Sequence, residues 1–220
     1  MMRTPRNGFA SSKIERVSFK IVLTVFILLL SLLFNNSLSG KERNREMGIV
    51  LVAVGEIDRN VMDWLMNHLN KVFNKQVLIG KGMPDPDYAH HKKRNQYLST
   101  VILNAIVEQK EYSPYEKILG IVDHDLYVPE LNFVFGEASR KAAVISMTRL
   151  RQIFYHLPED QSLFRQRVLT EAVHELGHTF GLGHCENPRC VMFFSNSLED
   201  TDRKGSEFCH KCKNLLRPSH

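Results

Sequence analysis

The sequence lacks several features that mark specialised classes of protein. It has no internal repeat and no low-complexity linker, and no cysteine precedes residue 185. Its hydrophobic content of 43% is too high for a disordered chain. At 220 residues the chain is long enough to bury the core of one well-packed domain. We therefore expect a single globular domain.

Most of the chain also lacks an excess of charge, although the formal net charge is +5 and the pI is about 9.0. Residues 1–46 hold eight of the 29 Lys and Arg residues and three of the 24 Asp and Glu residues. The other residues hold 21 of each sign, so their formal net charge is zero. A nucleic-acid-binding domain usually carries a basic surface. The charge balance therefore argues against a DNA or RNA partner.

A hydrophobic run long enough to cross a membrane is lacking as well. The longest run, residues 21–34, would form a helix of about 21 Å, shorter than the ~30 Å hydrocarbon core. Basic residues precede this run, and small residues such as Ser37 and Ser39 follow it. This order is typical of an export signal. We therefore predict that residues 1–46 are a basic, hydrophobic signal peptide or short membrane anchor.

Two localisations follow from this prediction. If residues 1–46 are genuine, the protein is exported, or it is associated with a membrane through residues 21–34. Met47 directly precedes the first convincing strand, so translation could instead start there. In that case the first 46 residues are an artefact and the protein is cytoplasmic. In both cases residues 47–220 form the functional domain.

The main chemical signal is residues 174–185, which have the sequence HELGHTFGLGHC. On a helix, His174 and His178 lie one turn apart on the same face and can bind one metal ion. Glu175 lies beside them and can act on a metal-bound water as a general base. The alternative interpretation is an amphipathic helix with surface histidines.

A third candidate ligand, His184, is too far along for a straight helix to bring it to the same ion. The helix must therefore end between His178 and His184. Gly181 can end it, because glycine adopts positive φ without a steric penalty. Three imidazoles with one open position are typical of catalytic zinc, whereas a structural site has four protein ligands.

Apolar periodicity predicts an α/β domain. We expect strands at residues 48–55, 77–79, 118–122, 133–135 and 142–147, and helices at residues 57–73, 97–106 and from near 158 to 180. The basic cluster at residues 90–94 is interpreted as a solvated helix start. Asp123 and Asp125 are interpreted as a polar turn. The alternation of strands and helices favours a mixed, mostly parallel sheet with an antiparallel edge strand near the site.

The four cysteines form two pairs after the third histidine: Cys185 with Cys190, and Cys209 with Cys212. Two such pairs match a closed four-thiolate zinc site, which would also hold the neighbouring His184 in place. Two disulfides or a redox-active pair are the alternatives. Met192 follows the second cysteine and is a candidate for an apolar floor under the metal.

These residues resemble the archaemetzincins, a family of metzincin zinc metallopeptidases. The family pattern is HExxHxxGxxHCx4CxM, a spacer of about seventeen residues, and CxxC. It is matched here by His174, Glu175, His178, Gly181, His184, Cys185, Cys190, Met192, Cys209 and Cys212. The spacer, residues 193–208, is one residue shorter. The segments RNQYLSTVIL and LNFVFGEA are also similar to the family.

The resemblance implies a zincin-like metzincin α/β domain whose active-site helix carries HExxH. It implies a catalytic zinc on the three histidines, a structural zinc on the four cysteines, and Glu175 as the general base. The expected function is peptide-bond hydrolysis of a peptide or protein substrate by a monomer. The alternatives are an amidase acting on a non-peptide substrate, or a zinc-stabilised binding or scaffold protein. Some metzincins add a tyrosine ligand after the methionine, but the last tyrosine here is Tyr155.

Overall fold

The computed structural model describes residues 47–216, and its framework is one sheet with the strand order β2-β1-β5-β8-β7. The parallel strands are β1 (Met47–Val54), β2 (Val77–Ile79), β5 (Tyr115–Val122) and β8 (Ala142–Ser146). In the register of the sheet, Val50 pairs with Leu78 on one side and with Ile118 on the other. The edge strand β7 (Gly136–Ala138) is antiparallel to β8. The predicted mostly parallel sheet with an antiparallel edge strand is confirmed.

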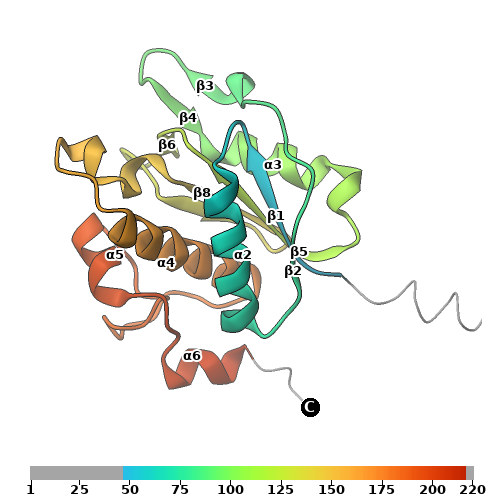
Figure 1. The fold of residues 1–220 in the computed structure, drawn as a ribbon, viewed down its shortest axis with the longest axis vertical. Coiled ribbons are helices and arrows are strands. Elements are labelled where there is room, and N and C mark those ends of the chain that lie inside the picture. The colour runs from blue at the N-terminus through green and yellow to red at the C-terminus, as the bar shows by residue number, and fades with distance from the viewer. Residues whose placement is uncertain (1–46, 217–220) are drawn as a thin grey trace, which may run out of the picture. The chain divides into compact units, whose positions relative to one another are not determined.

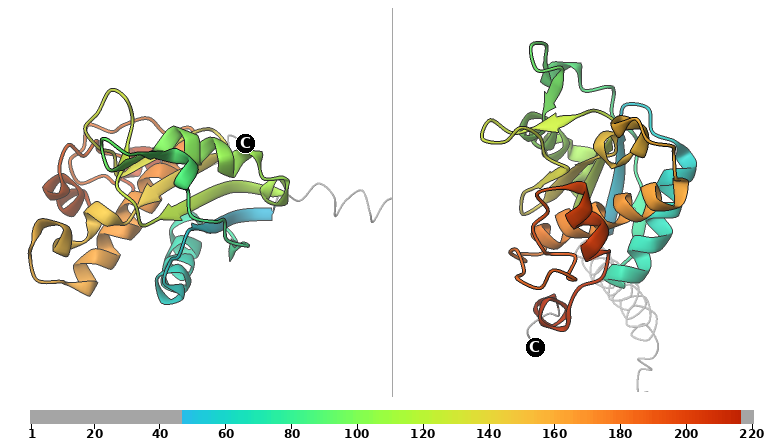
Figure 2. Two further views of the ribbon diagram at one scale, coloured as in Figure 1. Left: turned by 90° about the horizontal axis from the view of Figure 1, so that it is seen from above. Right: turned by 90° about the vertical axis from the view of Figure 1, so that its left-hand side faces the viewer.

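Helices cover both faces of this sheet. In Figures 1 and 2, α2 (Arg59–Phe73) and α4 (Gln161–Thr179) lie on one face, and α3 (Ser99–Glu108) lies on the other. Neighbouring residues of β1 therefore enter different cores: Leu51 packs on the α2 and α4 side, and Val52 packs on the α3 side. Burial of both faces explains why β1 and β8 are continuous apolar runs without alternation.

Three short strands form a second sheet above the carboxyl ends of the main strands. They are β3 (His90–His91), β4 (Gln96–Leu98) and β6 (Leu126–Tyr127), in the order β3-β4-β6. β3 and β4 are antiparallel, and Asn95 adopts a φ of 52° in the turn between them. The helix start predicted at residues 90–94 is therefore wrong, and Tyr97 belongs to β4 instead of the helix that follows.

The predicted strand at residues 133–135 is wrong in position. β7 begins one residue later, and within 133–135 a single bridge joins Val134 to Leu126. Short 3₁₀ helices occur at Asp87–Ala89, Lys110–Tyr112, Thr148–Leu150 and Gln152–Tyr155. Of the last two elements, α5 (Leu198–Lys204) packs against α4, and α6 (His210–Leu215) lies below both in Figure 1.

No helix within residues 47–216 is both long and apolar enough to cross a membrane. The signal or anchor predicted at residues 21–34 lies outside the described residues.

Candidate active site and metal-ligand clusters

Helix α4 carries the first part of the site; a side chain fixes its beginning, and a glycine follows its end. The Asp160 carboxylate accepts hydrogen bonds from the backbone N–H groups of Ser162 and Leu163, both at 2.9 Å, so the helix begins slightly later than predicted. It ends at Thr179, and Gly181 follows with a φ of +87°. A Cβ at Gly181 would meet no atom within 4 Å, so glycine is required there by its backbone conformation.

Two carbonyl groups orient the imidazoles of His174 and His178. Nδ1 of His174 lies 2.7 Å from the carbonyl oxygen of Val191, and Nδ1 of His178 lies 2.8 Å from that of Leu182. A carbonyl only accepts, so each Nδ1 carries the proton and each Nε2 carries a lone pair. The two Nε2 atoms are 3.1 Å apart. Two lone pairs facing each other at this distance repel, unless a cation lies between them.

His184 completes the cluster. Its ring centroid lies 5.5 Å from that of His174 and 4.9 Å from that of His178. The three residues can each place one nitrogen within 4.8 Å of the others, and the turn at Gly181 makes this possible. Within residues 47–216 this cluster has three members, which leaves a coordination position open to solvent or substrate. The donor set and spacing fit a zinc ion.

Burial keeps these imidazoles neutral, the form that binds a metal. It lowers the pKa of His174 well below its usual value, and the ammonium of Lys204 lowers it further. Burial likewise lowers the pKa values of His178 and His184.

The carboxyl group of Glu175 is buried next to the histidines. Burial raises its pKa well above the usual value, and the negative charge of Glu171 adds to the effect. The edge strand β7 approaches this side chain closely, because a Cβ at Gly136 would lie 2.6 Å from Cγ of Glu175. The sequence alone does not reveal this role of Gly136, because the contact joins segments about forty residues apart.

Met192, the candidate for an apolar floor, is fully buried against α4. A Cβ at Gly177 would lie 2.4 Å from the sulfur of Met192, so the methionine packs against α4 between the turns that carry His174 and His178. Gly177 is the x residue directly before the second histidine of the motif, and the pattern alone gives it no role.

The four cysteines form a second cluster. All are free thiols, and their sulfur atoms lie within 4.8 Å of one another. The sulfurs of Cys185 and Cys209 are 3.8 Å apart, far longer than a disulfide bond of about 2.05 Å. Sulfurs at Zn–S distances of about 2.3 Å in a tetrahedron would be separated by about 3.8 Å. A hydrogen bond from the backbone N–H of Cys212 contributes most to lowering the pKa of Cys209 to about 7, which favours the thiolate.

A buried ion pair between α4 and α5 lies next to His174. Nζ of Lys204, in α5, lies 3.2 Å from Oε1 of Glu171 in α4, and 3.3 Å from Nδ1 of His174. Neither charged side chain is more than 3% exposed. The Thr201 hydroxyl donates a second hydrogen bond to Glu171, at 3.0 Å. The sequence alone does not reveal this pair, because a lysine twenty residues after His184 carries no pattern of its own.

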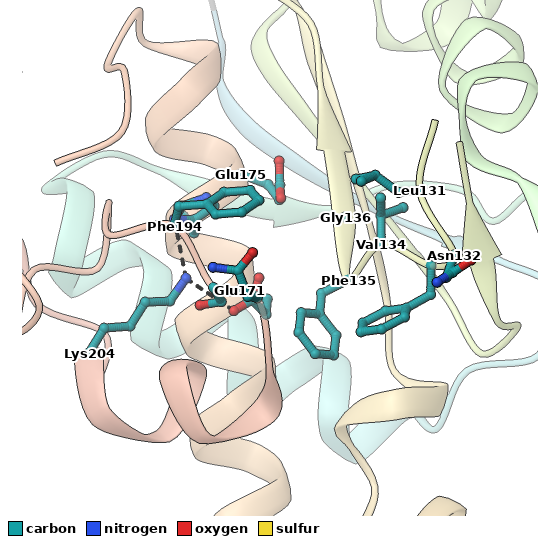
Figure 3. A pocket seen from close by; sticks show the side chains of 13 residues that line it. Leu131, Asn132, Val134, Phe135, Gly136, Glu171, Glu175, Phe194 and Lys204 are labelled. Atoms are coloured by element: carbon teal, nitrogen blue, oxygen red, sulfur yellow. Dashed lines mark hydrogen bonds and ion pairs between the residues drawn. The ribbon is translucent and has the colours of Figure 1, made fainter. Parts of the chain in front are cut away.

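A groove with a volume of about 550 Å³ runs along the site. Its lining includes Glu175, the three histidines, and all three residues of β7. A deeper pocket of about 230 Å³ adjoins it and shares Gly136, His174, Glu175 and Phe194 with it. Figure 3 shows Glu175, Glu171 and Lys204 on one side of this pocket, and Val134, Phe135 and Gly136 on the other.

The turn at Asp123 and Asp125 supports this pocket from outside. Asp125 accepts two hydrogen bonds from Arg149, at 2.5 and 2.8 Å, and the Arg149 guanidinium lies 4.2 Å from the ring centre of Phe133, a pocket wall. Asp123 accepts from Arg151 at 2.9 Å. Both carboxylates thus have basic partners, in agreement with the interpretation of a polar turn.

Comparison with known proteins gives a consistent result. Residues 44–218 match the family model described as peptidase family M54. The archaemetzincin of Methanocaldococcus jannaschii is 40% identical over 173 residues, which cover 78% of this chain and 93% of that protein. Among solved structures, the archaemetzincin of Methanopyrus kandleri aligns with a TM-score of 0.68 at 40% identity, covering 79% of this chain and 95% of that one.

A zinc-dependent peptidase from Methanocorpusculum labreanum aligns with a TM-score of 0.70 at 30% identity, covering 77% of this chain and all of that one. These similarities extend over the sheet, the helix α4 and the cysteine-rich tail, and they agree with the zincin-like fold. The chain therefore belongs to peptidase family M54, the archaemetzincin family of zinc metallopeptidases.

Proposed function

We propose that the chain hydrolyses peptide bonds, with His174, His178 and His184 holding a catalytic zinc ion and the four cysteines holding a second, structural one. The observation that carries this proposal is the convergence of three imidazoles and the Glu175 carboxyl group on one groove. When bound, zinc would supply Lewis acidity, which polarises a carbonyl group and makes a bound water more acidic. The zinc-dependent peptidase of Methanocorpusculum labreanum has the same fold.

Glu175 acts on protons in this proposal. Its carboxylate accepts a proton from the water that attacks the scissile carbonyl carbon, and then donates it to the nitrogen of the departing amine. Burial raises the pKa of Glu175 well above its usual value, which makes the carboxylate a stronger proton acceptor. The close approach of Gly136 holds the carboxyl group at the groove.

The scaffold alternative is less consistent with the site. A structural zinc site is normally closed by a fourth protein ligand, and the histidine cluster within residues 47–216 has three members. A scaffold also has no use for a buried carboxyl group beside an open metal position. Hydrolysis of a non-peptide amide would use the same residues, so it becomes an outcome of the experiment.

The test is mass spectrometry of a diverse peptide mixture after incubation with the zinc-loaded chain. We expect new peptide termini from the wild type, and a decrease in turnover of about 10²- to 10⁴-fold in the Glu175→Gln variant with its zinc content unchanged. The matched control is Glu108→Gln, because Glu108 is exposed at the end of α3.

Wild-type activity in Glu175→Gln would contradict the proposed role of the carboxyl group. If the wild type with two zinc ions cleaves none of the peptides, the peptidase proposal is wrong. Hydrolysis of small acyl amides by the same preparation would then favour the amidase.

A further inference from the structure

The pocket beside Glu175 has walls and a base of different character. Its walls are largely apolar: Leu131, Phe133, Val134 and Phe135 on the β7 side, and Phe194 on the other. Its volume of about 230 Å³ is about eight times the ~30 Å³ occupied by a water molecule in the liquid. The pocket can thus hold one large side chain. Because it shares Glu175 and Gly136 with the groove, that side chain would belong to a residue next to the scissile bond.

The base of the pocket disfavours a charged side chain. Lys204 and Glu171 neutralise each other there, and Figure 3 shows both below Glu175. A substrate carboxylate would face the charges of Glu171 and Glu175, whereas a substrate ammonium or guanidinium group would face Lys204. Each would also lose its hydration in a largely apolar cavity. The electrostatics therefore favour a neutral side chain.

The pocket also contains unused hydrogen-bonding capacity. The Ser195 hydroxyl oxygen is buried and has no hydrogen-bond partner within residues 47–216, so it can rotate without breaking a hydrogen bond there. The Lys204 ammonium has three N–H donors. Glu171 and the Phe193 carbonyl, at 3.4 Å, accept two of them, whereas Nδ1 of His174 is itself a donor. One N–H of Lys204 therefore lacks an acceptor among the residues that the structure describes.

We propose that this pocket binds the tyrosine side chain of a substrate residue that flanks the scissile bond, and that Ser195 determines the preference for tyrosine over phenylalanine. The ring contacts the aromatic walls, and the phenolic hydroxyl, which can both donate and accept, meets the unpaired polar groups of the lining. This inference rests on the proposed peptidase function and specifies the substrate class of the same site.

The test begins with the cleavage sites found in the peptide mixture. Tyrosine is expected to be enriched at one of the two positions flanking the cleaved bond. Peptides that differ only by Tyr or Phe at that position are then compared by kcat/KM. One net hydrogen bond predicts a preference for tyrosine of about 2- to 10-fold. Ser195→Ala should bring the Tyr/Phe ratio close to one, and Ser195→Thr, which keeps the hydroxyl, should retain the preference.

Equilibrium binding of the same two peptides to the Glu175→Gln variant gives a second measurement that requires no turnover. The dissociation constants should show the same preference for tyrosine, and adding Ser195→Ala should remove it. Enrichment of charged residues at both flanking positions, or a Tyr/Phe ratio unaffected by Ser195→Ala, would overturn the inference while leaving the peptidase function intact. If no peptide is cleaved at all, the peptidase function fails, and this inference fails with it.

Discussion

Two glycines of the site act through the absence of a side chain. Neither Gly136 nor Gly177 has positive φ, so backbone conformation does not require glycine at either position. The requirement is space: Glu175 occupies the place of a Cβ at Gly136, and the sulfur of Met192 occupies that place at Gly177. Gly136 thus lets β7 approach Glu175 closely, and Gly177 lets Met192 pack directly against α4.

Gly136→Ala is therefore expected to damage catalysis. The new Cβ would lie 2.6 Å from Cγ of Glu175 and 2.8 Å from the Val144 carbonyl oxygen, so either Glu175 or β7 must move. A displacement approaching 1 Å at a catalytic group lowers kcat/KM by up to about 100-fold. We expect a decrease of at least about 10-fold, with the zinc content unchanged because the histidines are not touched.

The matched control is Gly183→Ala. A Cβ at Gly183 would meet no atom within 4 Å, and its φ is not positive, so the same substitution should change kcat/KM by less than about 2-fold. Equal effects of the two substitutions would show that the contact between Gly136 and Glu175 does not position the carboxyl group.

At the scale of elements, polar contacts join the short helix α5 to α4. The Arg167 guanidinium donates two hydrogen bonds to Asp202, both at 2.7 Å, and Glu171 accepts from Thr201 and pairs with Lys204. Because α5 follows the segment that carries Phe194 and Ser195, these contacts hold one side of the pocket against the active-site helix.

Removing one member of the buried pair should destabilise the fold. Lys204→Met leaves Glu171 buried without its cation, which should lower the free energy of unfolding by about 3–5 kcal/mol. The control is Arg203→Met in the same helix. Arg203 is 53% exposed and pairs with Glu199, which is 83% exposed, so its loss should cost less than about 1 kcal/mol. Urea unfolding of both zinc-loaded variants measures the difference, and equal costs would contradict the importance of the buried pair.

Helices and strands could be predicted from the sequence where the apolar residues follow a single clear pattern, either a continuous run or a helical period. The continuous runs of β1 and β8 and the periodicity of α2 are local signals, and these elements lie within a few residues of their predicted positions. The prediction failed at Tyr97, where apolar spacing was taken as helical although the residue pairs with His90 in a hairpin. It also failed near Phe133, because an apolar stretch packs as well in an extended loop as in a strand.

At the scale of the whole molecule, the sequence revealed the site residues that share one motif. It did not reveal the site residues that distant segments contribute. His174, His178 and His184 share one motif, so their convergence follows from a helix and a turn. Lys204 and Ser195 reach the same region only because the cysteine-rich tail folds back beside α4, and no local pattern specifies this path. The pocket that we propose to set specificity therefore became visible only in the structure.

The cysteine cluster and the histidine cluster should contribute differently to the stability and to the activity of the protein. The cysteines join residues 185–190 to residues 209–212, so a zinc ion there fixes the path of the tail, whereas the histidines lie on a helix and a turn that other contacts already hold. We expect two zinc ions per wild-type chain, and one in each of two variants: Cys209→Ala with Cys212→Ala, and His184→Ala. His184 is exposed, so its removal should disturb little packing.

The thermal stabilities of these variants should differ. A structural zinc contributes directly to the free energy of folding. A loss of even ~3 kcal/mol would lower the Tm of a domain of this size by roughly 10 °C. The cysteine variant should therefore melt at least roughly 10 °C below the wild type, and His184→Ala should show a much smaller decrease together with loss of peptide cleavage. Zinc analysis and calorimetry test this at equal free zinc, and a larger decrease in Tm for His184→Ala would reverse the proposed division between a catalytic and a structural ion.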